Sequence, residues 1–402
     1  MELKHIFKKV RGLQRVKVIY NCCIKNFYST TASPVVCEDD VKHFRTLESN
    51  PMNHTLQHEG KFYSIPPKTY KKLFTLGGFS KSYEVQFKTF RENCIMVRYP
   101  ALQIMNYLET ANYSLPPVHY VIYGRNGTGK SAILNHIVHY ASEKNWLLLH
   151  IPWAPNWTRR PKDTATSLWD QGTDKMDLPI DSALWLQHFH SQNSLLLQEL
   201  DLRLSKTYEW SKRESTNEGE PLTALIDKGV NRMKFASGCI AALLQEIKLH
   251  VQTGRFKDKL RVLVAIDGVN CFFYPTKLKR EDKSVVEPDQ VTPIHAFRKL
   301  FGNDWTDAAV VTTVDPVASA DIKTAAYTPH ALLGKEGFDC LDPFVPILVE
   351  NYTEKEIDSC LDYYVDRMWI QNENGRGETG RKELKFLSGY NPRSLQKICA
   401  PI

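Results

Sequence analysis

The 402-residue chain is predicted to be an α/β protein, with a P-loop NTPase core on a parallel sheet and a helical C-terminal lid. Residues 124–131 read Gly-Arg-Asn-Gly-Thr-Gly-Lys-Ser and fit the pattern G-x-x-x-x-G-K-[ST]. They stand between an apolar run at 118–123, typical of a buried strand, and an apolar helical pattern at 129–143. A second apolar run at 146–151 completes a strand–helix–strand unit, which indicates parallel strands.

This glycine loop (residues 124–131) carries the main candidate site. Its three glycines let the backbone wrap tightly and turn N–H groups inward, and a helix N-terminus favours bound phosphate. Lys130 can reach the terminal phosphates, and the Ser131 hydroxyl can ligate Mg²⁺. The alternative is a glycine-rich turn that binds nothing. The candidate nucleotide-binding residues are Gly124, Arg125, Asn126, Gly127, Thr128, Gly129, Lys130 and Ser131.

Composition sets the broad class. Hydrophobic residues make up 42% and charged residues 24% of the chain, as in soluble globular proteins, and no apolar run approaches the ~18 residues of a membrane span. The nine cysteines are scattered without a C-x-x-C pair, which argues against a zinc site and indicates a reducing compartment.

The first 37 residues differ from the rest in charge. They hold seven lysines and arginines against one acid and end in a hydroxyl-rich stretch, whereas the remaining chain has a net charge of only +1. This composition predicts a mitochondrial transit peptide over 1–37. The alternative is a basic arm that stays attached and touches RNA. Because residues 38–402 are nearly neutral overall, any RNA contact by that part of the chain must use local basic patches.

The N-terminal half contains two less regular stretches. Residues 38–66 are polar and contain prolines, which predicts an extended lead-in, and residues 82–112 are expected to be partly helical. Residues 153–180 are rich in Trp, Pro, Arg, Asp and Thr, and we expect a long surface insertion. The alternative for that insertion is a solvated excursion with no partner.

Periodicity assigns the remaining elements. Two more buried strands are expected at 261–266 and 308–313, and helices at 184–204 and 229–249. In the tail, Thr353 and Glu356 form a capping box for a helix, a glycine-rich loop follows at 375–380, and two short helices are expected at 382–387 and 394–399. The predicted division is 1–37 transit peptide, 38–112 extended segment with helix, 113–345 nucleotide-binding core with insertions, and 346–402 helical lid.

Polar residues at strand ends extend the site. Asp267 follows a buried strand, where a carboxylate helps to hold Mg²⁺, so Ser131 and Asp267 are the candidate metal ligands. Thr313 ends the next strand at the height of a γ-phosphate sensor, and Arg393 begins a terminal helix from which it can reach nucleotide. Threonine is also common in strands, and an arginine there can simply face solvent.

Gly268 bears on catalysis. Many hydrolysing phosphate-loop proteins place a glutamate after the strand-end aspartate to polarise water, but here that residue is glycine. A positioned base contributes about 10²–10⁴ in rate, so we expect slow hydrolysis or none. Glu281 or Asp282 could act as the base instead, but nothing in the sequence positions either of them. We therefore assign no catalytic residue. No guanine-reading N-K-x-D motif stands in a suitable place.

Basic clusters near aromatic residues raise the possibility of RNA contact. Lysines and arginines bind phosphates, and exposed aromatic rings stack on bases. The alternative is solvated charge above a buried aromatic core. The clusters are Arg159 and Arg160; Lys206, Lys212 and Arg213; and Lys277, Lys279 and Arg280, with Trp153, Trp157, Tyr208, Trp210, Phe272, Phe273 and Tyr274 nearby.

Seven stretches make the chain resemble the death-associated protein 3 family, a GTP-binding protein family of the mitochondrial small ribosomal subunit. The more specific ones are Lys-Arg-Glu-Ser-Thr at 212–216 and Leu-Asp-Pro-Phe-Val-Pro-Ile at 341–347, whereas the glycine loop is generic. The others are 123–130, 146–152, 264–270, 278–284 and 333–339, and the resemblance spans most of 54–400. The family loop often ends in Lys-Thr; Ser131 keeps the hydroxyl, but Arg125 and Asn126 depart from the usual pair.

The resemblance implies a phosphate-loop fold of the AAA-like class, guanine nucleotide and a reported link to apoptosis. It also implies contacts with ribosomal RNA, with neighbouring ribosomal proteins and, through an intersubunit bridge, with the large subunit. The expected function is a nucleotide-binding structural component of this ribosome in the mitochondrial matrix, with GTP (or GDP or ATP) and Mg²⁺ bound. The alternatives are an AAA-like nucleotidase that remodels nucleic acid or protein, separable by turnover, and an apoptotic signalling adaptor.

Overall fold

The computed structural model describes residues 42–169, 174–254, 260–319 and 326–400. Lys42–Ile402 form one compact unit. The predicted transit peptide, 1–37, lies outside the described residues. Within the described residues, no helix is both long and apolar enough to cross a membrane.

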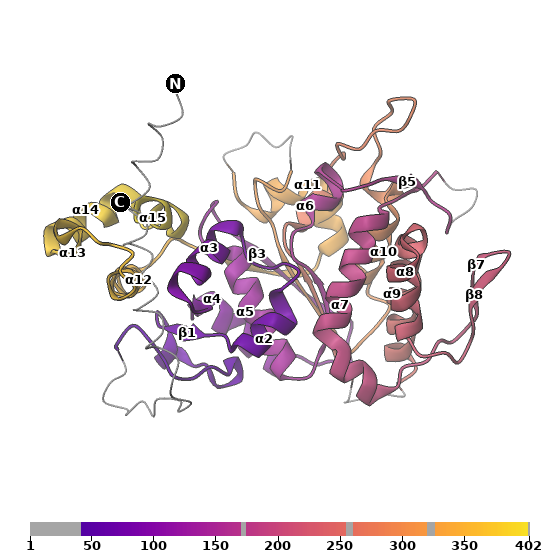
Figure 1. Cartoon of the computed structure of the whole chain (residues 1–402), viewed down its shortest axis with the longest axis horizontal. Coiled ribbons are helices and arrows are strands. Elements are labelled where there is room, and N and C mark those ends of the chain that lie inside the picture. Colours follow the sequence, from indigo (N-terminus) through magenta and orange to yellow (C-terminus); the bar gives the residue numbers. More distant parts are fainter. Residues whose placement is uncertain (1–41, 170–173, 255–259, 320–325, 401–402) are drawn as a thin grey trace, which may run out of the picture. The chain divides into compact units, whose positions relative to one another are not determined.

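A five-stranded parallel sheet forms the centre of this unit (Figure 1). All four pairs of neighbouring strands are parallel. Four strands lie where the sequence predicts them, and their runs of Val, Ile, Leu and Ala are almost completely buried, as expected for a sheet covered on both faces. In sheet order the strands are β11 (Phe344–Leu348), β3 (Val118–Tyr123), β10 (Ala308–Thr313), β9 (Val262–Ile266) and β4 (Leu147–Ile151).

The fifth strand, β11, has no counterpart in the sequence prediction. It pairs only with β3 and forms one edge of the sheet. Its central residue is Pro346, which has no backbone N–H to donate to a neighbouring strand, and its presence argues against a strand in this part of the sequence. Proline is tolerated here because an edge strand has a partner on one side only.

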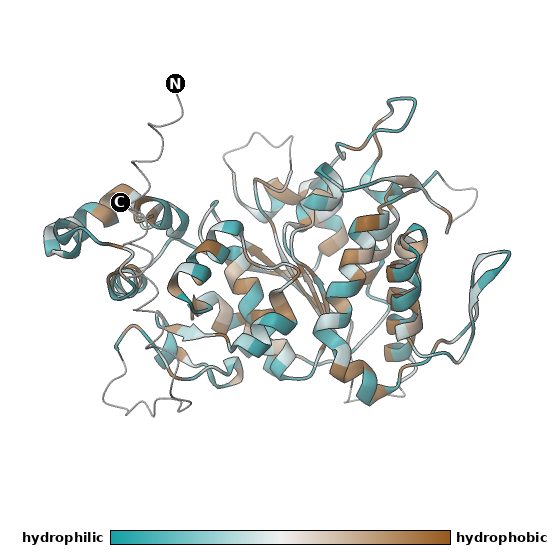
Figure 2. Ribbon diagram, viewed as in Figure 1, coloured by the Kyte–Doolittle hydropathy of each residue, from teal (hydrophilic) through white to brown (hydrophobic). Residues whose placement is uncertain are grey.

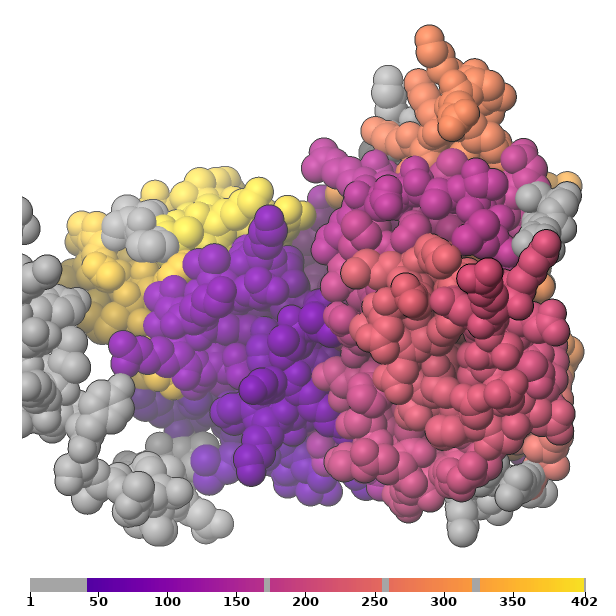
Figure 3. Space-filling model, turned by 45° about the vertical axis from the view of Figure 1, so that its right-hand side comes forward, coloured from indigo at the N-terminus to yellow at the C-terminus, as the bar shows by residue number. Residues whose placement is uncertain are grey.

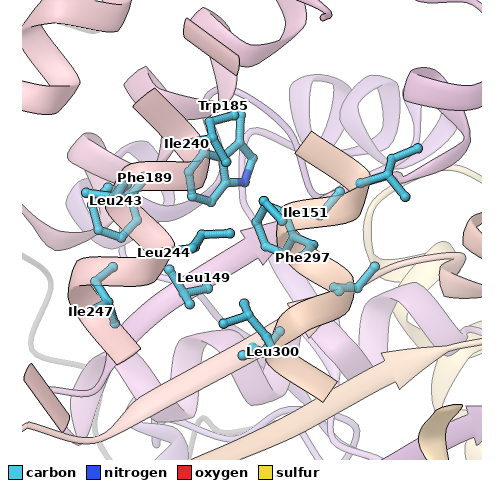
Figure 4. Packing of buried hydrophobic residues seen from close by; sticks show 14 of the residues in the cluster. Leu149, Ile151, Trp185, Phe189, Ile240, Leu243, Leu244, Ile247, Phe297 and Leu300 are labelled. Carbon is cyan, nitrogen blue, oxygen red and sulfur yellow. The ribbon is translucent and has the colours of Figure 1, made fainter. Parts of the chain in front are cut away.

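Alternate residues along each strand enter two separate hydrophobic clusters, one on each face of the sheet. In β9, Val262, Val264 and Ile266 face one cluster, whereas Leu263 and Ala265 face the other. The first cluster is covered by α7 (Pro179–Leu200), α8 (Thr223–Asn231), α9 (Ala236–Gln252) and α10 (Thr292–Arg298). Figure 4 shows Trp185 and Phe189 of α7 and Ile240 and Leu243 of α9 beside Leu149 of β4.

The second cluster lies beneath helices from the N-terminal part of the chain. These are α2 (Pro67–Phe74), α3 (Lys81–Phe90), α4 (Tyr99–Thr110) and α5 (Lys130–Glu143). In Figure 2 the central strands are largely brown, whereas the helices carry teal and brown residues in alternation. The amphipathic pattern that predicted α5 therefore reflects burial against the sheet.

A third cluster joins the C-terminal helices to the beginning of the described chain. It contains Phe44 together with residues of the antiparallel strands β1 (Phe62–Ser64) and β2 (Cys94–Met96). The C-terminal helices are α12 (Glu354–Asp366), α13 (Glu373–Arg376), α14 (Glu378–Ser388) and α15 (Pro392–Ile398). The predicted capping box of Thr353 and Glu356 is confirmed at the start of α12.

Two local predictions are wrong. The helix expected at 229–249 is interrupted, because α8 ends at Asn231 and a 3₁₀ turn at Met233–Phe235 precedes α9. The loop expected at 375–380 is largely helical. Gly380 lies in α14, and a Cβ there would stand 2.0 Å from the carbonyl oxygen of Asn374, so this glycine allows two short helices to approach closely.

The insertions carry short elements of their own. They contain α6 (Pro155–Arg159), the strand pair β5 (Ala165–Thr166) and β6 (Met176–Asp177), and the strand pair β7 (Tyr208–Ser211) and β8 (Glu214–Thr216). The helix α11 (Pro329–Leu341) precedes β11. The long insertion predicted at 153–180 is thus partly regular.

Candidate nucleotide-binding site

The glycine loop connects β3 to the N-terminus of α5 and lies at the carboxyl end of the sheet. Gly124, Gly127 and Gly129 have φ angles of 151°, 85° and 99°, which residues with a side chain rarely adopt. A Cβ on Gly124 would also stand 2.2 Å from the carbonyl oxygen of Val349, the residue after β11. The fold therefore demands glycine at these positions independently of any ligand.

Lys130 is the first residue of α5, and its side chain is buried against the loop. Its Nζ donates to the carbonyl oxygens of Gly124 (3.0 Å) and Arg125 (2.9 Å) and lies 2.8 Å from Oδ2 of Asp315. Asp315 was missed by the sequence analysis. It lies two residues beyond β10, so a polar residue soon after a buried strand was the available signal.

Asp267 and Thr313 lie at the ends of neighbouring strands, and their side chains meet at the carboxyl end of the sheet. The Thr313 hydroxyl donates to the Asp267 carboxylate and accepts a hydrogen bond from the Gly268 N–H (2.8 Å). Burial raises the pKa of Asp267 to about 6, although hydrogen bonds from Ser131 and Thr313 oppose the increase. Ser131 and Asp267 are thus close enough to share one ion.

The donor set suits Mg²⁺. No group of three or more His, Cys, Asp or Glu ligands that could hold a metal occurs among the described residues. Mg²⁺ at a phosphate loop needs only one or two protein oxygens, because phosphates and water complete its octahedron. A cation would also favour the charged form of Asp267, whose negative charge is otherwise costly at this depth.

The position of Gly268 disfavours the glutamate found in many hydrolysing proteins. Its φ is 78°, and a Cβ would stand 3.1–3.2 Å from Pro155, Ala318 and Trp153. Glu281 and Asp282 do not line the cavity described below. Among its lining residues the carboxylates are Asp181, Asp267 and Asp315.

A cavity of about 660 Å³ opens beside the glycine loop. Its volume is in the range of small-molecule sites. Lys130, Ser131, Asp267 and Asp315 line one side of it. The remaining walls come from residues 76–83 between α2 and α3, from α7, and from Tyr352, Tyr364, Pro392, Arg393 and Gln396 of the C-terminal part.

The start of α15 touches the tip of the glycine loop. The Arg393 backbone N–H donates to the Gly127 carbonyl (3.1 Å), and its guanidinium donates to Oδ1 of Asn126 (3.2 Å). Asn391 donates to the Asn126 carbonyl (3.1 Å). A Cβ on Gly127 would lie 2.7 Å from the Cβ of Arg393, so glycine permits this contact.

Arg98, at the start of α4, is a residue that sequence reasoning did not find. Its side chain is buried and donates to the Thr128 carbonyl of the glycine loop (2.6 Å). It also forms a bidentate pair with the buried carboxylate of Glu356 in α12 (2.7 and 3.1 Å). Further donors reach the carbonyls of Glu350 and Asn351. A single guanidinium thus joins the glycine loop to the C-terminal helices, and no local pattern announces such a contact.

For most of the aromatic residues near the basic clusters, the alternative of solvated charge above a buried aromatic core is confirmed. Trp157, Tyr208, Trp210, Phe272 and Phe273 are buried in the core, so their rings are not available to stack on bases. These rings pack in the core beneath loops whose charged side chains face water, so they are near the basic residues without sharing a surface with them. The lysines of these clusters, Lys206, Lys212, Lys277 and Lys279, are exposed.

The central parallel sheet of five strands and the helices on its two faces define an α/β protein, and the glycine loop between β3 and α5 is consistent with a P-loop-like core. The mitochondrial ribosomal death-associated protein 3 family matches residues 95–398, and the chain belongs to that family. It is 42% identical over 356 residues to small ribosomal subunit protein mS29 of Bos taurus, covering 89% of this chain and 87% of that protein. It is 39% identical over 374 residues to the Mus musculus protein of the same name, covering 93% of each.

A chain of the solved E. coli MS115-1 HORMA–CdnC–Trip13 complex also aligns with this one. The alignment covers 82% of this chain and 80% of that chain, at 11% identity and a TM-score of 0.29. A score this low carries no argument about the fold or the site.

Proposed function

We propose that the protein is a nucleotide-binding structural component of the small subunit of the mitochondrial ribosome. The observation that carries the nucleotide part is the convergence of Lys130, Ser131 and Asp267 on one side of a 660 Å³ cavity at the glycine loop. GTP is the nucleotide that the family resemblance implies, with GDP and ATP as alternatives, and Mg²⁺ would lie between Ser131 and Asp267. Membership of a mitochondrial ribosomal family makes this a ribosomal protein of the mitochondrial matrix.

Each loop residue has a proposed role. The backbone N–H groups of residues 124–131 would surround the phosphates, and Lys130 would exchange its carbonyl partners for phosphate oxygens. Thr313 holds Asp267 in place, and Arg393 stands at the loop tip where it can reach the nucleotide. The nucleotide would act as a structural ligand, since a molecule that binds only the folded state stabilises it by RT ln(1 + [L]/Kd).

Within the ribosome, we propose contacts with ribosomal RNA, with neighbouring small-subunit proteins and, through an intersubunit bridge, with the large subunit. The support is the name of the relatives, small ribosomal subunit protein mS29, which cover most of this chain. A link to apoptosis follows only from the family resemblance. Cross-linking mass spectrometry of intact mitochondrial ribosomes tests the bridge, because cross-links confined to small-subunit proteins contradict it.

Replacing Lys130 with alanine is expected to weaken nucleotide binding about a hundredfold or more, because charge-assisted hydrogen bonds to phosphate are lost. Isothermal titration calorimetry with GTP and ATP in the presence of Mg²⁺ measures this loss and the base preference together. The matched control is Lys144→Ala, which removes an ion-paired lysine at the other end of α5. Unchanged affinity in a folded Lys130→Ala protein would falsify the phosphate-loop assignment.

Hydrolysis is expected to be slow, because Gly268 supplies no carboxylate beside Asp267 and Asp315, the alternative carboxylate, is paired with Lys130. Single-turnover kinetics with labelled GTP measure the rate directly. A rate of ~1–10³ s⁻¹, as in ordinary enzymes, would favour the remodelling-nucleotidase alternative. In that case Asp315→Asn should reduce the rate about 10²–10⁴-fold, as expected for loss of a general base.

A further inference from the structure

The segment Lys61–Arg91, which contains α2 and α3, has an unusual charge. It holds seven lysines and arginines against one glutamate, a net charge of +6. The rest of residues 38–402 has a net charge of −5. The positive charge of the body is therefore concentrated in this one segment, which we call the basic segment. Its cations are Lys61, Lys68, Lys71, Lys72, Lys81, Lys88 and Arg91.

These cations lie at or near the surface, and one of them, Lys72, has the carboxylate of Glu143 in its vicinity. Lys68, Lys71, Lys81, Lys88 and Arg91 are exposed, and Lys61 and Lys72 are half-buried. None of the seven belongs to any ion pair identified among the described residues, whereas elsewhere lysines and arginines commonly pair. The uncompensated charge points to a polyanionic partner that supplies the missing negative groups.

The basic segment also has a defined shape. Aromatic contacts hold α2 against α3, with Tyr70 5.8 Å from Phe87 and Phe74 5.0 Å from Phe79 between ring centroids. Between the two helices runs a groove of about 560 Å³. Tyr70, Lys88 and Arg91 line it, and the carboxylates of Glu84 and Glu92 lie in the same lining. Glu92 is neutralised by ion pairs with Arg45 and Arg367. In Figure 3 the indigo and purple atoms of this part of the chain form an extended area of the face shown.

We propose that the basic segment binds the sugar–phosphate backbone of RNA. Lysines and arginines on exposed helices neutralise phosphates, and the half-buried ring of Tyr70 in the groove offers an unpaired base a stacking surface. The choice of RNA rests on the proposed ribosomal function. This segment is not among the three clusters that the sequence analysis considered as candidates for RNA contact.

Two other partners fit less well. Anionic membranes bind amphipathic helices that insert an apolar face, but Leu73 and Phe74 of α2 and Phe87 and Phe90 of α3 are already buried in the protein. Protein interfaces are depleted in lysine. Five of the seven cations are exposed, which suits a partner with regularly spaced negative charges.

The test compares two variants of the full chain with equal change in charge. The first is Lys68→Gln/Lys71→Gln/Lys88→Gln/Arg91→Gln, in the basic segment. The control is Lys206→Gln/Lys212→Gln/Arg213→Gln/Lys279→Gln, in the clusters expected from sequence. The probe is a fluorescent RNA stem-loop of about 20 nucleotides, and anisotropy titrations from 50 to 300 mM KCl give the affinity and its salt dependence.

The basic-segment variant is expected to bind at least about tenfold more weakly. The slope of log K against log[KCl] should fall by about 3, close to one per phosphate contact removed. The control should retain wild-type affinity and slope within about twofold, and both variants should bind GTP like the wild type. An equal loss in both variants contradicts the proposal, because it would reflect net charge alone.

Two further outcomes separate this proposal from the proposed function. If the wild type binds the RNA but the basic-segment variant binds it equally well, only the surface assignment is wrong. If the wild type binds no RNA, both the surface and the RNA contact proposed for the ribosome are contradicted, while GTP titration still tests the nucleotide site. Sedimentation with cardiolipin vesicles is expected to show no difference between the variants, and a loss confined to the basic-segment variant would assign the segment to membranes instead.

Discussion

Replacing Arg98 with methionine is expected to lower the free energy of unfolding by about 3–5 kcal/mol, the usual cost of leaving a buried charge unpaired. The substitution leaves the Glu356 carboxylate, which is 2% exposed, without its guanidinium. It also leaves the Thr128 carbonyl without a donor. Urea denaturation followed by circular dichroism measures the change.

The matched control for Arg98 is Arg367→Met. Arg367 also joins α12 to the N-terminal part of the chain, through Glu92, but it is about a third exposed and does not touch the glycine loop. Solvent screens such a pair, so we expect a loss of about 1 kcal/mol or less. Arg98→Met/Glu356→Gln should recover part of the stability, because the stranded charge is removed. A loss below 1 kcal/mol in Arg98→Met would show that the pair does not hold the two parts together.

Mild acid is expected to destabilise the protein strongly, because several buried histidines are held neutral. Burial lowers the pKa of His54 and His188 to about 4, and lowers the pKa of three others. The unfolded chain, with a histidine pKa near 6.5, binds these protons first. The stability is therefore complete above pH 6.5 and falls as the pH drops towards 4. The other three are His119, His136 and His150.

The size of this effect follows from proton linkage. A histidine whose pKa falls from 6.5 to about 4 on folding costs about 2 kcal/mol between pH 7 and pH 5, so His54 and His188 together cost about 4 kcal/mol. Asp267, with a pKa raised to about 6, acts in the opposite direction but is a single group. Thermal melts between pH 7.5 and 5 should show a large fall in Tm.

Two variants on one helix measure how much a buried histidine contributes to the pH dependence of the unfolding free energy. His188→Gln removes a buried histidine of α7 and should make the unfolding free energy less dependent on pH between 7 and 5. The matched control is His190→Gln, which removes an exposed histidine two residues later on the same helix. Equal pH dependence in both variants and the wild type would mean that His188 does not titrate differently on folding.

The prediction of the fold succeeded where local periodicity and burial coincide. The strands β3, β4, β9 and β10 are continuous apolar runs because both faces of the sheet are covered. It failed at β11, where Pro346 masks an edge strand that is defined only by pairing with β3. It also failed at Gly380, which looks like a loop residue but serves a close contact between helices.

The candidate site divides in the same way. The motif identified the glycine loop, including Ser131. The position of Asp267 and Thr313 at the ends of buried strands identified these two residues as candidates at the same edge of the sheet. Asp315 and Arg98 were not found, because their partners are distant in the chain. The aromatic residues near basic clusters could not be separated from core residues by sequence, since burial of a ring depends on what packs over it.

By itself, the sequence determined the P-loop-like strand, loop and helix, the order of the buried strands and the resemblance to a mitochondrial ribosomal family, because each depends on neighbouring residues or on motif spacing. Only the tertiary structure decided that Arg98 and Arg393 join the C-terminal helices to the glycine loop. It also decided that most cations of the basic segment, whose clustering is visible in the sequence, are exposed and that none belongs to an ion pair identified among the described residues. Charge pairing and burial are relations between residues far apart in the chain, and a linear pattern does not contain them.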